Sequence, residues 1–186
     1  MKITLIGDSI CLGYQQLVRE KVGARAEVWA PEANCGHSLL HRENFSAWYL
    51  EARPDVVHFN AGIWDVVPPT GDLGPRFTVS AYVRNLRLIV RRLRAETKAR
   101  VIFATTTPIL FPLDATPKEM CRIDPLLQRF NAAAVRLMRE SGVEVDDLYS
   151  VIVNAGVNDC LLDDKVHMTP RGNEVLSDAV VRFILG

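Results

Sequence analysis

Short apolar runs alternate with longer segments of helical periodicity along the whole chain. The apolar runs are rich in Val and Ile and lie at 2–7, 26–30, 55–60, 100–105 and 143–147. The segments with helical periodicity lie at 10–22, 45–51, 80–98, 121–141 and 170–184. Such runs are typical of strands buried on both faces, and their alternation with helices favours a parallel sheet covered on both sides. The sequence therefore predicts an α/β fold with a five-stranded parallel sheet.

Size and charge limit the kinds of protein that this chain can be. With 186 residues, 48 % of them apolar, we expect a single domain spanning 1–186. The 22 basic residues balance the 22 acidic ones, so there is no global field to attract nucleic acid or an anionic membrane. We expect neither of these partners, and the composition leaves the oligomeric state open.

Targeting signals and cysteine pairs are not evident. Residues 1–6 lack the extended apolar segment of a signal peptide, and no apolar run approaches about 18 residues. The four cysteines are scattered without a CxxC pair, which indicates reduced thiols. The expectation is a cytoplasmic protein.

Two helices have informative sequences. Thr169 can cap the last one and Pro170 suits its first turn, which places residues 164–167 in the loop just before it. The helix at 80–98 carries five arginines, namely Arg84, Arg87, Arg91, Arg92 and Arg94. They could form a patch for an anionic ligand, but a solvated helix face is the favoured interpretation.

Two long connections, 31–44 and 61–79, each follow a predicted strand and are dense in Gly, Pro, Asn and Thr. In parallel sheets, ligands bind at the loops that follow the carboxyl ends of the strands. The first predicted strand has its carboxyl end at the same edge of the sheet, and its end carries the sequence Gly7-Asp8-Ser9. Ser9 is a candidate nucleophile beside the positive end of a helix dipole, and the alternative is that Asp8 or Ser9 simply caps that helix.

A base for Ser9 can come from the loop near the other end of the chain. Asp164 and His167 are close enough in sequence for one loop to carry both an imidazole and the carboxylate that orients it. The neighbouring Asp163 is a competing carboxylate. Three other histidines compete as bases: His58 is expected to be packed within a strand, whereas His37 and His41 could line a pocket in the first long loop.

Four sequence blocks resemble those of the SGNH (GDSL) hydrolases. They are Gly7-Asp8-Ser9-Ile10, Gly36-His37-Ser38, Asn60-Ala61-Gly62-Ile63-Trp64-Asp65 and Asp164-Lys165-Val166-His167, in the family's order. The resemblance implies a flavodoxin-like, three-layer α/β/α sandwich without a metal or cofactor. It also implies that Ser9 is the nucleophile, His167 the base and Asp164 its orienting group, with the Ser9 and Gly36 amides in the oxyanion hole.

The third block departs from the family's usual Gly-x-Asn-Asp, because Trp64 occupies the position of the oxyanion-hole Asn. Family members with an Asn-x-Gly-x-x-Asp block are similar to this chain, so Asn60 is the preferred third donor, with a loop-bracing amide as the alternative. Asn34 is a second candidate in the same neighbourhood, and Asp65 is expected to brace the loop. We expect Trp64 and Asn34 to contact the substrate.

These features together predict a serine esterase for a small-molecule acyl ester. The favoured substrate is an acetyl group on a carbohydrate, because Trp64, Phe77 and Phe111 could form an aromatic wall for a sugar ring. A thioesterase or a lysophospholipase would use the same machinery. A non-catalytic carbohydrate-binding or scaffold protein is the alternative of a different class, favoured by the Trp64 departure alone.

Overall fold

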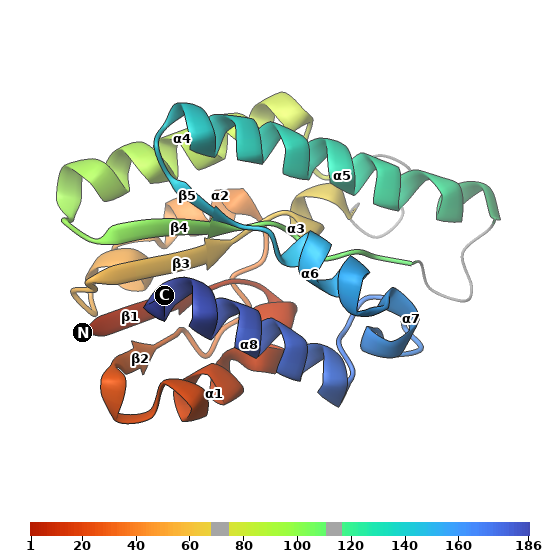
Figure 1. Cartoon of the computed structure of the whole chain (residues 1–186). Coiled ribbons are helices and arrows are strands. Elements are labelled where there is room, and N and C mark those ends of the chain that lie inside the picture. Colours follow the sequence, from red (N-terminus) through yellow and green to blue (C-terminus); the bar gives the residue numbers. More distant parts are fainter. Residues whose placement is uncertain (68–74, 111–116) are drawn as a thin grey trace.

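A five-stranded parallel sheet forms the centre of the molecule (Figure 1). The computed structural model of the chain describes residues 1–67, 75–110 and 117–186. The strands, in the order β2-β1-β3-β4-β5, are β1 (Lys2–Ile6), β2 (Glu27–Trp29), β3 (Val56–Asn60), β4 (Arg100–Ala104) and β5 (Glu144–Asp146). All four neighbouring pairs are parallel, so the predicted α/β sheet is confirmed.

Helices connect the strands. They are α1 (Ser9–Val22), α2 (Ser38–Glu43), α3 (Ile63–Val66), α4 (Val79–Glu96), α5 (Pro117–Glu140), α6 (Leu148–Ala155), α7 (Val157–Cys160) and α8 (Pro170–Leu185). A 3-10 turn follows α1 at Gly23–Arg25, and a π-helical turn lies at Ser46–Leu50. None of the described helices is long and apolar enough to cross a membrane.

The helices form two layers, one on each face of the sheet, as the resemblance implied. α1 packs against α8, and α8 also packs against α6; α4 packs against both α2 and α5 (Figure 1). The chain moves from β1 outward to β2 in one direction, and from β3 through β4 to β5 in the other. Because crossover connections are right-handed, these opposite directions place α1 on one face and α4 and α5 on the other.

The expected elements differ from the observed ones mainly in the loops. The two connections expected at 31–44 and 61–79 contain the short helices α2 and α3, and the helix expected at 45–51 is a π-helical turn. α6 and α7 were not predicted, because helices of eight and four residues carry too few turns for a clear period. The last helix has the predicted cap, with Thr169 Oγ1 accepting a hydrogen bond from the Gly172 amide at 3.1 Å.

A buried polar pair crosses the sheet inside the core. His58 on β3 and Asp146 at the end of β5 are both almost fully buried, and His58 Nε2 lies 3.0 Å from Asp146 Oδ2. Their side chains meet across β4, which separates the two strands. His58 is therefore packed in the core, as expected. Its side chain also links β3 to β5, which are not adjacent in the sheet.

Replacing Asp146 with Ala should lower the free energy of unfolding by about 1–3 kcal/mol, because the buried His58 ring nitrogen loses its partner. Urea denaturation followed by circular dichroism measures this change. Asp163→Ala, at an exposed position, is the control and should leave the midpoint unchanged. Equal midpoints for Asp146→Ala and the wild-type protein would contradict the role of the pair.

Candidate active site

The turn from β1 into α1 sets the position of Ser9. A Cβ atom at residue 7 would lie 2.6 Å from Cys11 Cβ, so the turn requires glycine there. Asp8 caps the helix, with its Oδ1 accepting a hydrogen bond from the Ile10 amide at 3.0 Å. Since Asp8 makes the cap, the Ser9 hydroxyl is available for another partner.

That partner is His167, which lies 158 positions away in sequence. Ser9 Oγ is 2.9 Å from His167 Nε2, and His167 Nδ1 is 2.6 Å from Asp164 Oδ2. The structure therefore brings together the three residues predicted as nucleophile, base and orienting group. The competing carboxylate, Asp163, is exposed and makes no hydrogen bond or ion pair with another described residue.

The loop that carries His167 is held by its own backbone. Asp164 Oδ1 accepts hydrogen bonds from the Val166 and His167 amides, both at 2.9 Å. Lys165 has a φ of 61°, a left-handed conformation that closes this tight turn. The Leu110 amide donates to the Lys165 carbonyl at 2.9 Å, which ties the turn to the segment after β4. The imidazole is thus oriented before any ligand arrives.

Two carboxylates near Ser9 have opposite electrostatic environments. Partial burial works to raise the pKa of Asp164, but the hydrogen bonds from the Val166 amide and from His167 outweigh it and lower that pKa. Burial raises the pKa of Asp8 to about 6, although the Ile10 amide and His167 counteract it. The second oxygen of Asp8, Oδ2, is buried and has no hydrogen-bond partner among the described residues. Asp164 is therefore an anion over a wide pH range, whereas the raised pKa of Asp8 is about 6.

The segment predicted to complete the oxyanion hole lies beside the Ser9 turn. The Cys35 amide donates to the Gly7 carbonyl at 3.1 Å, which joins the two backbones. Gly36 has a φ of +60°, a conformation that favours glycine. Its amide donates to Asn34 Oδ1 at 3.0 Å. Asn34 therefore presents an oxygen to this amide, and a substrate oxygen that binds there has to replace it.

The side-chain amide of Asn60 makes its hydrogen bonds to β4 and to the segment that follows it. Its Nδ2 donates to the Ala104 carbonyl at 2.9 Å and lies 3.4 Å from Thr106 Oγ1. Both contacts join the end of β3 to β4 and the residues that follow it. This arrangement corresponds to the loop-bracing alternative, and it leaves no side-chain N–H of Asn60 directed at Ser9.

Asp65 links the block from Asn60 to Asp65 to the Gly36–Ser38 segment. It is buried, and it accepts hydrogen bonds from the backbone amide of Ser38, at 3.0 Å, and from the Ser38 hydroxyl. The Ser38 hydroxyl in turn accepts a hydrogen bond from Asn85 Nδ2 at 2.9 Å, and Arg42 donates to Asn85 Oδ1 at 2.9 Å. Burial raises the pKa of Asp65 to about 6, against the effect of the Ser38 hydrogen bonds. The chain of contacts spans α2, α3 and α4 and holds the Gly36–Ser38 segment in place.

Two of the three aromatic residues predicted to form a wall, Trp64 and Phe77, lie in segments joined by a hydrogen bond from the Phe77 amide to the Asp65 carbonyl at 3.0 Å. Trp64, the residue after Ile63 in α3, is 36 % exposed, and its carbonyl accepts a hydrogen bond from Arg76 Nε at 3.0 Å. Phe77 meets the half-buried His37 ring edge-on, with 5.3 Å between the centroids. Phe111 lies outside the described residues.

The histidines expected to line a pocket do not serve as bases for Ser9. His37 caps α2, with its Nδ1 accepting a hydrogen bond from the Leu40 amide, and burial together with Arg76 lowers its pKa. The prediction for His41 is wrong: it is fully buried in α2 and its Nδ1 lies 2.7 Å from the Tyr49 hydroxyl. Burial lowers the pKa of His41 to about 3, so it is a neutral core residue. In the described ranges, no group of three or more His, Cys, Asp or Glu side chains is arranged to hold a metal ion.

Known proteins share both this sequence pattern and this fold. Residues 5–175 match the family described as GDSL-like lipase/acylhydrolase. The GDSL esterase/lipase CPRD49 of Arabidopsis thaliana is 25 % identical over 136 residues, which are 69 % of this chain and 53 % of that protein. The chain thus spans about half the length of this curated relative.

Solved structures extend the similarity to the fold. The crystal structure of the acetyl xylan esterase AlAXEase aligns with a TM-score of 0.81 at 17 % identity, covering 99 % of this chain and 100 % of that one. The lipase/acylhydrolase from Enterococcus faecalis aligns with a TM-score of 0.80 at 22 % identity, covering 98 % and 94 %. At these identities the comparison establishes a common α/β fold.

Asp8→Asn should change how stability depends on pH. Because the pKa of buried Asp8 is raised, the native state holds a proton that the unfolded state releases between about pH 4 and 6. The free energy of unfolding of the wild-type protein should therefore fall, relative to that of Asp8→Asn, as the pH rises through this window. Asn is also a good helix cap, so the substitution preserves α1. Urea denaturation at a series of pH values tests this, and parallel profiles for the two proteins would contradict it.

Proposed function

Because this chain belongs to the GDSL-like lipase/acylhydrolase family, we propose that it is a serine ester hydrolase acting on small acyl esters. The observation that carries the proposal is the line of hydrogen-bond contacts from Asp164 through His167 to Ser9, at 2.6 and 2.9 Å. Nucleophile, base and orienting carboxylate lie within direct reach of one another, the arrangement that nucleophilic catalysis by serine requires.

Acylation begins at Ser9. His167 Nε2 accepts the hydroxyl proton as Oγ attacks the carbonyl carbon of the ester. Asp164 accepts a hydrogen bond from His167 Nδ1–H, which keeps Nε2 free to accept the proton and stabilises the imidazolium that forms. The lowered pKa of Asp164 keeps it negatively charged while His167 carries the proton.

The developing oxyanion is stabilised by backbone amides. The Ser9 amide is a donor at the positive end of α1, and the Gly36 amide is the second. The carbonyl oxygen of the substrate replaces Asn34 Oδ1 on the Gly36 amide. Asn60 supports the hole by bracing β3 against β4, and it does not donate to the oxyanion.

Collapse of the tetrahedral intermediate releases the alcohol. His167 returns the proton to the leaving oxygen, and the acyl group remains on Ser9 Oγ. A water molecule then attacks the acyl-enzyme, with His167 again as base, and the acid leaves. Each step uses the same donor and acceptor atoms, so one geometry serves acylation and deacylation.

A short acyl group, acetyl in particular, on a carbohydrate is the substrate that we favour. The exposed Trp64 supplies a surface on which a sugar ring can stack. Similarity to the acetyl xylan esterase AlAXEase is in keeping with this choice.

Ser9→Ala should abolish hydrolysis of p-nitrophenyl acetate, and Asp164→Asn should lower kcat by about 10³ to 10⁴, because the imidazole loses its orienting acceptor. Asp163→Asn changes the adjacent exposed carboxylate and is the matched control, with a kcat near the wild-type value. Labelling of Ser9 by a fluorophosphonate should be absent in Ser9→Ala, reduced in Asp164→Asn and near the wild-type level in Asp163→Asn. An unchanged rate for Ser9→Ala, or equal effects of the two Asp→Asn variants, would refute the proposal.

Ser38→Ala should lower kcat about ten- to a hundredfold with little change in KM, because Ser38 positions the Gly36 segment through Asp65 without touching the substrate. Ser38→Thr, which keeps the hydroxyl, should recover most of the rate. Ser46→Ala, at an exposed serine, is the control. A rise in KM at constant kcat would assign Ser38 to substrate binding instead.

The substrate class is tested with a panel of acetylated xylo-oligosaccharides, p-nitrophenyl esters of increasing chain length, acyl thioesters and lysophospholipids. We expect the highest kcat/KM for acetyl esters and a steep decline with acyl length. Preference for a thioester or a lysophospholipid would retain the Ser9 chemistry and overturn the acetyl assignment.

A further inference from the structure

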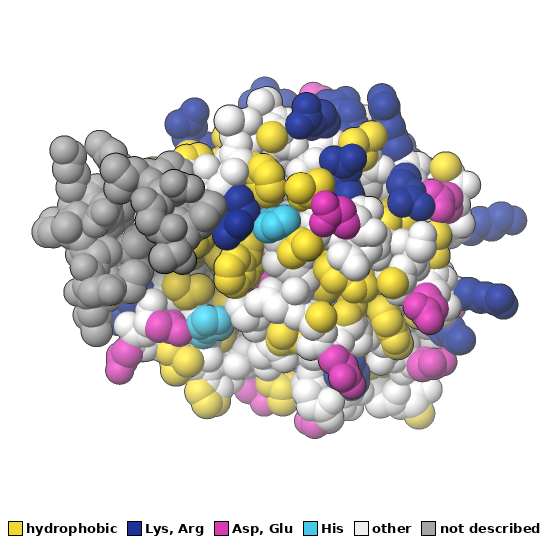
Figure 2. All heavy atoms as spheres, turned by 180° about the vertical axis from the view of Figure 1, so that it is seen from behind, with side chains coloured by type: hydrophobic (Ala, Val, Ile, Leu, Met, Phe, Trp, Pro, Cys, Tyr) yellow, Lys and Arg dark blue, Asp and Glu magenta, His cyan; other side chains and the backbone are white. Residues whose placement is uncertain are grey.

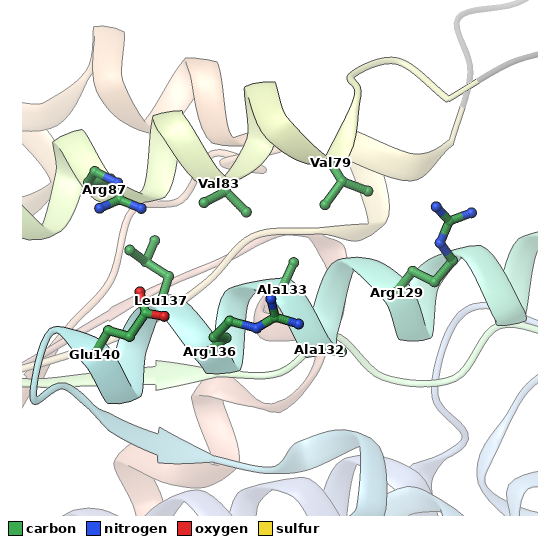
Figure 3. Close-up of a pocket in the computed structure, with 9 residues that line it drawn as sticks. All are labelled: Val79, Val83, Arg87, Arg129, Ala132, Ala133, Arg136, Leu137 and Glu140. Atoms are coloured by element: carbon green, nitrogen blue, oxygen red, sulfur yellow. The ribbon is translucent and has the colours of Figure 1, made fainter.

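A groove runs between α4 and α5, away from Ser9 and His167. It has a volume of about 550 Å³, within the range of about 300–1,000 Å³ typical of small-molecule sites. Apolar side chains, Val79, Val83 and Leu137, line its middle, and Arg87, Arg129 and Arg136 surround them (Figure 3). None of the residues predicted for the catalytic site contributes to this groove.

The sequences of the two helices explain why the space is open. On α4, Val79, Val83 and Arg87 recur every four residues, so they form one stripe along the helix. On α5 the residues that face this stripe include Ala132 and Ala133, whose methyl groups are too short to fill the space (Figure 3). The helices meet through other side chains, among them Tyr82 of α4 and Phe130 of α5, whose ring centroids are 5.1 Å apart.

The charges around the groove are unbalanced. Three guanidinium groups and one carboxylate, that of Glu140, line it, although the whole chain has a formal net charge of zero. Arg87, Arg129 and Arg136 make no hydrogen bond or ion pair with another described residue. Other arginines do: Arg92 pairs with Glu96, and Arg100 with Glu144. From behind, Lys and Arg side chains gather along the upper and right-hand margins of the molecule, and α4 lies in the upper right part of this view (Figure 2).

We propose that this groove binds a small organic anion with two acidic groups joined by an apolar body. Arg129 and Arg136 are seven residues apart on α5, which separates them by about 10 Å along the helix axis. Arg87 lies on α4 across the groove, opposite Leu137 and Glu140 and toward the end away from Arg129 (Figure 3). Guanidinium groups bind phosphates and carboxylates with paired hydrogen bonds, and the valines and leucine between them cover the apolar body.

This assignment divides the basic helix predicted from the sequence. Arg87 belongs to the groove, whereas Arg92 lies over the Phe45 ring at 4.0 Å and pairs with Glu96. Arg84 and Arg91 are exposed and outside the groove, as a solvated face requires. The site is independent of ester hydrolysis, since its ligand contacts are made by α4 and α5 alone.

Isothermal titration calorimetry at low ionic strength tests the proposal with three probes. Dodecanedioate joins two carboxylates through an apolar chain, decanediol bisphosphate joins two phosphates in the same way, and pyrophosphate has no apolar body. We expect dodecanedioate or decanediol bisphosphate to bind at least about tenfold more tightly than pyrophosphate, because only they cover the apolar lining. The stronger of the two identifies the acidic group.

Matched variants assign the binding to the groove. Arg87→Gln/Arg136→Gln should weaken binding at least about tenfold, whereas Arg84→Gln/Arg91→Gln removes the same charge outside the groove and should have less than about a twofold effect. Ala133→Leu keeps all charges, fills the groove and should also weaken binding. All three variants should hydrolyse p-nitrophenyl acetate at the wild-type rate.

Two results would overturn the proposal. The first is that neither dodecanedioate nor decanediol bisphosphate binds to the wild-type protein. The second is that the two arginine pairs weaken binding equally, which would show a non-specific effect of net charge. Circular dichroism of each variant confirms that a loss of binding does not come from unfolding.

Discussion

The pairing of β1 with β3 at the centre of the sheet determines where the chemistry of this chain can occur. The two strands are adjacent, but the chain leaves them toward opposite sides, through α1 on one face and α4 on the other. Loops that diverge from adjacent strand ends leave a crevice between them, the usual ligand site of parallel sheets. Ser9 follows β1, and the block from Asn60 to Asp65 begins at the last residue of β3, so both border this crevice.

The polar network around the crevice divides into parts that act on the substrate and parts that hold them. Asp164 orients His167 through the ring, and the backbone of its own turn orients Asp164. Asp65 holds the Gly36 segment in a similar way, because it accepts hydrogen bonds from both the amide and the hydroxyl of Ser38. These supports are carboxylates in two environments: one is exposed with a lowered pKa, and the other is buried with a raised pKa.

The departure at Trp64 has a structural consequence. With tryptophan in the usual position of the oxyanion-hole Asn, the nearest carboxamide from the same block is that of Asn60, and it is engaged with Ala104 on β4. The site that we propose therefore relies on backbone amides, one of which is covered by Asn34 in the absence of substrate. The Trp64 side chain itself is left 36 % exposed.

The sequence by itself determined the class of fold and the residues that meet at the crevice. Apolar runs of strand length, separated by helices, favour a parallel sheet covered on both faces. The motif order placed Ser9 and Gly36 in segments that follow strands, and the Asp164–His167 loop before the last helix. Only the tertiary structure decided how each polar side chain is used. Asn60 braces β4, His41 bonds Tyr49 in the core, and Arg87 joins Arg129 and Arg136 around a groove. The reason is physical: periodicity reports burial along one element, whereas a hydrogen-bond partner or a gap between helices depends on residues that only folding brings together.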